Sequence, residues 1–71
     1  MTLFESWKRK RFIQRVEGAI ANLDRDRRLA IYSLPEDILA EGLAQGYQAT
    51  GDKVKHTMDF LSNSAETHAR W

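Results

Sequence analysis

Hydrophobic side chains recur at three- and four-residue steps along most of this chain, which is the spacing of one face of an α-helix. In the first third they are Phe12, Val16, Ala19, Ile20 and Leu23. No stretch alternates apolar and polar residues in the manner of a β-strand. The pattern therefore predicts an all-α fold.

Local signals divide the chain into helices. Ser33 and Glu36 have the spacing of a capping box, and Pro35 suits the first turn of the helix that would follow. Gly51 suits a left-handed helix stop, and Asp52 suits the next N-cap. We expect a single domain over residues 1–71, a small bundle of three main helices plus a short connecting helix. The expected ranges are about 3–23, 27–32, 34–49 and 53–68.

The first predicted helix carries apolar residues on two opposite sides. Leu3, Phe4 and Trp7 fall nearly opposite the stripe that begins at Phe12, at about 100° per residue. Either the helix breaks near Lys8–Lys10, or its first turns face a different partner from its later turns.

Two glycines lie one turn apart inside the third predicted helix. Gly42 and Gly46 each weaken a helix by about 1 kcal/mol relative to alanine. They mark either a groove where another helix approaches closely or a helix that frays near Gly46. The residues expected to pack helices together, within the chain or across a dimer, are Leu39, Gly42, Leu43, Gly46, Tyr47, Met58 and Leu61.

The size of the chain bears on its stability and its surroundings. A domain of 71 residues has a marginal core, and without cysteine it has no disulfide to support it, so we expect a homodimer. The absence of cysteine is typical of a reducing compartment. Charges interrupt every apolar run, which leaves neither a membrane span nor a signal peptide. We therefore expect a cytoplasmic protein.

Catalytic patterns are missing from the sequence. There is no glycine-rich phosphate loop, and His56 and His68 are twelve residues apart, too far to share a helical metal site. The serines have no general base in a recognisable frame. We expect no enzyme activity, no cofactor, no metal and no small-molecule substrate.

Positive charge is concentrated near the N-terminus. Residues 1–28 hold eight of the eleven Lys and Arg residues but only four of the ten acidic ones. Four consecutive basic residues on a helix point to all of its sides, so we do not expect a single basic stripe. The candidate partner-binding residues are Leu3, Phe4, Trp7, Lys8, Arg9, Lys10, Arg11 and Phe12.

A basic segment with interleaved aromatic residues indicates an acidic partner but does not identify it. We expect a non-enzymatic regulator, adaptor or inhibitor that binds another protein, because Trp and Arg are frequent interface anchors. Nucleic acid is the alternative, through phosphate contacts. A membrane surface is a second alternative, for which the apolar patch is small.

Overall fold

Four α-helices make up the part of the chain that the structure describes. This computed structural model describes the backbone of residues 3–69 and the side chains of residues 8–68. The helices are α1 (Leu3–Ala21), α2 (Arg25–Tyr32), α3 (Glu36–Gln48) and α4 (Lys53–Ala69), and residues 3–69 contain no strand. The predicted all-α class is confirmed, with three longer helices and a short one. The homodimer stays a prediction.

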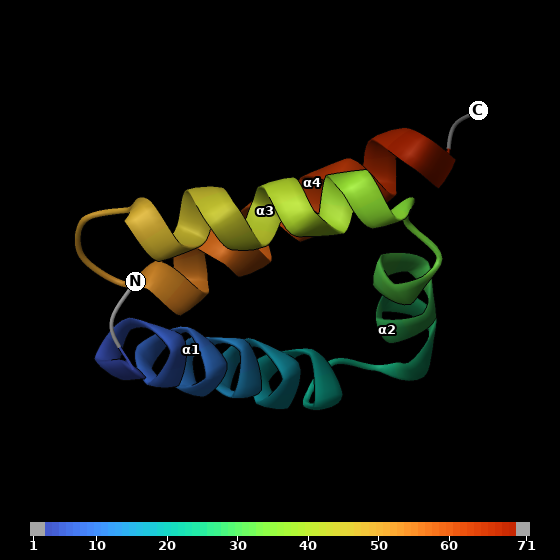
Figure 1. Ribbon diagram of the computed structural model, residues 1–71. Coiled ribbons are helices and arrows are strands. Elements are labelled where there is room, and N and C mark those ends of the chain that lie inside the picture. The colour runs from blue at the N-terminus through green and yellow to red at the C-terminus, as the bar shows by residue number, and fades with distance from the viewer. Residues whose placement is uncertain (1–2, 70–71) are drawn as a thin grey trace.

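The helices form an elongated bundle. α3 and α4 run antiparallel and side by side, α1 lies across them, and α2 joins α1 to α3 at one end (Figure 1). α1 packs mainly on α4, and so does α2. The molecule measures 40 × 21 × 21 Å, so its two ends present well-separated surfaces.

The core lies between α1, α2 and α4. From α1 it takes Phe12, Val16 and Ile20, three members of the predicted stripe, while Leu23 is half-buried beyond the end of the helix. The buried hydrophobic residues are Phe12, Val16, Ile20, Ile31, Leu34, Leu61 and Ala65.

α1 is continuous from Leu3 to Ala21, so the expected alternative of a break near residues 8–10 is wrong. The helix ends two residues before the expected Leu23. There the N–H groups of Asn22 and Leu23 donate to carbonyl oxygens three residues earlier, which tightens the last turn. α2 then begins at Arg25 with Asp24 as its N-cap residue, earlier than the expected start near residue 27.

The expected capping box at Ser33 and Glu36 is wrong. Ser33 ends α2 instead of starting α3, and its hydroxyl donates to the carbonyl oxygen of Leu29 at 2.7 Å. Pro35 takes the N-cap position of α3 in an extended conformation, so that helix begins at Glu36. Leu34, between the two helices, is buried in the core.

The turn between α3 and α4 follows the prediction. Gly51 has φ +82°, the left-handed conformation that glycine adopts without strain. The carboxylate of Asp52 accepts a hydrogen bond from the N–H of Lys55 at 3.0 Å, which is an N-cap contact for α4. α3 and α4 are therefore folded back as a hairpin, with Lys53 close to the end of α3.

Candidate functional site

A basic hollow lies where the first half of α1 meets the α3–α4 turn. It encloses about 410 Å³ and is lined by four cations and two aromatic rings. Among the residues whose side chains the structure describes, those that line the hollow include no carboxylate. They are Lys8, Arg11, Phe12, Arg15, Tyr47 and Lys53, and we call this set the basic hollow.

The cations of α1 reach the hollow because of helix periodicity. Lys8, Arg11 and Arg15 are spaced by three and four residues, so they share one flank of the helix. Burial of Phe12 and Val16 against the rest of the bundle fixes the rotation of α1 and turns this flank toward the start of α4. All three cationic side chains are exposed at its rim.

Lys53 supplies the fourth cation from the opposite wall. Its ammonium group donates to the carbonyl oxygen of Tyr47 and lies 5.2 Å from the centre of the Tyr47 ring. The first contact supports a carbonyl at the end of α3, where the helix dipole favours positive charge. Lys53 is thus held in place while its residue remains exposed.

The aromatic rings of the hollow are already engaged within the protein. The centres of the Phe12 and Tyr47 rings are 5.4 Å apart, with their planes inclined at 59°. The guanidinium of Arg9 lies 5.6 Å from the centre of the Tyr47 ring, a cation–π contact. Phe12 is only 6% exposed. These rings therefore shape the floor of the hollow and are poorly placed to stack on a flat ligand.

The basic run over residues 8–11 is divided between different surfaces. Lys8 and Arg11 line the hollow, Arg9 covers Tyr47, and Lys10 is exposed outside the lining set. The run thus points to several sides, as expected, but two of its members join cations elsewhere to form one surface. Sequence reasoning missed Arg15 and Lys53: spacing alone would have indicated Arg15, whereas Lys53 comes close only through the hairpin. The side chains of Leu3, Phe4 and Trp7 lie outside the described residues.

The predicted packing residues pack against other helices of the same chain. Leu39, Leu43 and Met58 are half-buried against the core, and Leu61 is 1% exposed. A Cβ atom on Gly42 would lie 2.8 Å from a ring carbon of Phe60, and one on Gly46 would overlap the Thr57 hydroxyl. The two glycines therefore allow α4 to approach α3 within one chain, and their face is not exposed.

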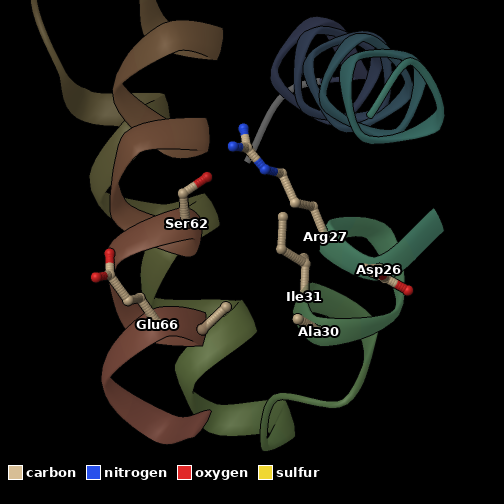
Figure 2. Close-up of a pocket in the computed structure, with 7 residues that line it drawn as sticks. Asp26, Arg27, Ala30, Ile31, Ser62 and Glu66 are labelled. Carbon is tan, nitrogen blue, oxygen red and sulfur yellow. The ribbon is translucent and has the colours of Figure 1, made fainter. Parts of the chain in front are cut away.

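A second hollow, of about 570 Å³, lies between α2 and α4, and we call it the α2–α4 hollow. Ala30, Ile31 and Ala65 give it an apolar floor. Figure 2 shows Arg27 extending from α2 toward α4, with Ser62 and Glu66 on the α4 side and Asp26 directed away from the space between the helices. An apolar recess with charged walls thus lies on a different part of the molecule from the basic hollow.

Two further features bear on the chemistry of the described residues. No three His, Asp or Glu side chains among them come together as a metal site would require. Within the same part of the chain, no helix is long and apolar enough to cross a bilayer.

Comparison of the chain with protein-family models, with curated proteins and with solved structures finds no match. The two hollows are therefore interpreted from their own geometry and charge.

Proposed function

We propose that this protein is a small, non-catalytic regulator, adaptor or inhibitor that binds an acidic segment of a partner protein in the basic hollow. The observation that carries the proposal is the convergence of four cations from two helices on one hollow, whose described lining residues include no carboxylate. Such a surface attracts negative charge, and the guanidinium of Arg15 is suited to bidentate pairing with a carboxylate.

The dimensions of the hollow suit a short acidic segment. From Lys8 to Arg15 the helix rises about 10 Å. This is about the length over which a partner helix presents two or three carboxylates at three- and four-residue steps. Lys53 faces them from the other wall.

The aromatic floor favours a protein partner over single-stranded nucleic acid. Binding of unpaired bases relies on rings that are free to stack. Here Phe12 is buried, and Tyr47 is in contact with Phe12, Arg9 and Lys53. Nucleic acid would then be held by phosphate contacts alone, which four cations in one compact cluster support less well than an extended basic track.

The proposal is tested by NMR titration of the full chain with a glutamate-rich peptide of about ten residues, long enough for about three helical turns. A peptide with glutamine in place of glutamate is the control, and a DNA oligonucleotide of equal charge is the competitor. We expect the glutamate peptide to shift the amide signals of residues 8–15 and 53 selectively. Stronger binding of the oligonucleotide at those signals, or equal shifts with the glutamine peptide, would contradict the proposal.

A further inference from the structure

The outward side of α2 carries the most exposed large hydrophobic residues among those described. Leu29 is 52% exposed and Tyr32 is 55% exposed. On the other side of the same helix, Ile31 is 1% exposed and lines the α2–α4 hollow together with Ala30. At about 100° per residue, Leu29 and Tyr32 therefore point away from the core. α2 thus buries one side and leaves two large apolar side chains on the other.

Two arginines share this outward side. Arg25 lies four residues before Leu29, and Arg28 lies four residues before Tyr32, so each arginine stands one turn nearer the start of α2. Arg25 is exposed and Arg28 is half-buried, and neither forms an ion pair among the described residues. We call the four residues Arg25, Arg28, Leu29 and Tyr32 the outer α2 face.

The charge of the outer α2 face is positive only. Its four residues span an arc of about 100° around the helix, and Asp24 and Asp26 fall outside that arc, one on either side. Asp24 pairs instead with Arg27, at 3.4 Å, and Arg27 also lies outside the arc. The face therefore has a basic first turn and an apolar second turn.

We propose that the outer α2 face binds an amphipathic helix of a partner protein, one that carries acidic residues a turn away from large apolar residues. The carboxylates of this helix pair with Arg25 and Arg28, and its apolar residues cover Leu29 and Tyr32. Tyr and Arg are frequent anchors of protein interfaces. From Arg25 to Tyr32 the helix rises about 10 Å, a length that two turns of a partner helix match.

The charges nearby favour a protein partner over an anionic lipid surface. Glu36 and Asp37 begin α3, four and five residues after Tyr32, and both are exposed. A uniformly anionic surface in contact with Tyr32 would also approach these carboxylates and repel them. A partner helix instead places its carboxylates over the arginine end alone. Two large apolar residues also give only a small area for insertion into lipid.

The outer α2 face and the basic hollow lie at opposite ends of the molecule. α2 joins α1 to α3 at one end, whereas the α3–α4 turn, beside the basic hollow, lies at the other (Figure 1). Two partner segments can therefore bind at the same time, as an adaptor requires. Binding at the outer α2 face does not depend on the proposed function, because the two surfaces share no residue.

The first measurement is an NMR titration of the full chain with a designed helical peptide of about 15 residues, long enough for about four turns. One side of the peptide carries glutamates in one turn and leucines in the next. We expect it to shift the amide signals of residues 25–32, and a peptide with glutamine and serine at those positions to leave them unchanged. Signals of residues 25–32 that do not move at millimolar peptide would overturn the inference. Movement of residues 8–15 and 53 would then support the proposed function alone.

The second measurement reverses the charge of the face with the double variant Arg25→Glu and Arg28→Glu. We expect at least about tenfold weaker binding of the glutamate peptide. A peptide with lysine in place of glutamate should bind this variant, because it restores the opposite charges. Lys10→Glu with Lys55→Glu is the control, since it makes the same change of charge at exposed positions on other helices. Equal losses in the two double variants, or no binding of the lysine peptide, would overturn the inference.

The third measurement tests the apolar turn and covers the case in which the charge variant fails to fold, as judged by circular dichroism. Leu29→Ala shortens an exposed side chain and should weaken peptide binding about tenfold. Ile13→Ala is the matched control, because Ile13 is an exposed hydrophobic residue on α1. Binding that is lost in the Ile13 variant and kept in the Leu29 variant would refute the inference.

Two further outcomes would assign the outer α2 face to a different occupant and overturn the inference. Signals of residues 25–32 that shift with protein concentration, without peptide, would assign it to a second copy of the chain. Sedimentation with vesicles of equal parts phosphatidylserine and phosphatidylcholine that Leu29→Ala abolishes would assign it to a lipid surface. We expect neither result.

Discussion

Thr57 of α4 occupies the space that a side chain on Gly46 of α3 would need. A Cβ atom on Gly46 would overlap the Thr57 hydroxyl and would lie 2.8 Å from the Cβ of Thr57 and 3.2 Å from the carbonyl oxygen of Lys53. Thr57 is fully buried, and its hydroxyl is directed inward by a hydrogen bond to the Lys53 carbonyl at 2.9 Å. The close approach of the two helices therefore depends on this pair.

Replacing Gly46 with alanine is expected to lower the free energy of unfolding by up to about 2 kcal/mol. The higher helix propensity of alanine would by itself raise the free energy of unfolding by about 1 kcal/mol. An added methyl group in a contact that is already filled costs about 1–3 kcal/mol. The neighbouring backbone cannot move freely to make room for it. Urea denaturation measures the change. On a Thr57→Ala background the same substitution should cost less, because the overlapping hydroxyl is gone. Equal costs on the two backgrounds would show that the two residues are not coupled.

Gly18 of α1 provides the matched comparison. It is exposed, and a Cβ atom placed on it meets nothing within 4 Å. Gly18→Ala should therefore raise the free energy of unfolding by about 0.5–1 kcal/mol, the ordinary gain for a helix interior. A loss of stability comparable to that of Gly46→Ala would refute the steric explanation for Gly46.

The structure also predicts that Asp52, at the start of α4, contributes more to stability than Ser33, at the end of α2. Asp52→Ala removes the side-chain acceptor at the N-terminus of α4 and should cost about 1 kcal/mol. Ser33→Ala removes only an exposed contact to the Leu29 carbonyl and should change stability by less than about 0.5 kcal/mol. Thermal unfolding of both variants checks the order. A larger loss at Ser33 would favour the capping box that the sequence indicated.

Salt should weaken binding of an acidic peptide to the basic hollow. The lining cations are exposed, and the Debye length falls from about 10 Å to about 3 Å between 0.1 and 1 M salt. The dissociation constant, measured by isothermal titration calorimetry, should rise steadily across this range. An affinity that is constant or increases with salt would indicate an apolar contact in place of the charge contact.

The sequence predicted the helices well because their signals are local. The stripe through Phe12, Val16 and Ile20, the stop at Gly51 and the cap at Asp52 depend only on neighbouring residues. The capping box failed for the opposite reason. Ser33 follows one helix and precedes another, and its hydroxyl bonds back to the Leu29 carbonyl of the earlier helix, a choice that residue spacing alone does not predict.

The candidate site was less accessible to sequence reasoning. Basic residues on α1 were identified, but Lys53 is distant in sequence and reaches the hollow only after α4 folds back on α3. The sequence analysis also missed Thr57, because burial is predicted from apolar residues and Thr57 is polar. Its position becomes clear from the fold, in which Thr57 packs directly against Gly46, a residue that has no side chain.

The most direct test of the basic hollow compares two double variants with the same change of charge. Lys8→Gln with Lys53→Gln removes one hollow lysine from each of α1 and α4, whereas Lys10→Gln with Lys55→Gln removes neighbouring exposed lysines from the same helices outside the lining set. Circular dichroism first establishes that both variants fold, since Lys53 also contacts the Tyr47 carbonyl.

The measurement is the affinity of each variant for the glutamate-rich peptide by isothermal titration calorimetry. Two lost charge contacts of up to about 1 kcal/mol each predict about a tenfold weaker dissociation constant for the Lys8 and Lys53 variant. The Lys10 and Lys55 variant should stay within about twofold of the unaltered chain. Equal losses in the two variants would show that binding depends on net charge and not on the hollow, and would contradict the account.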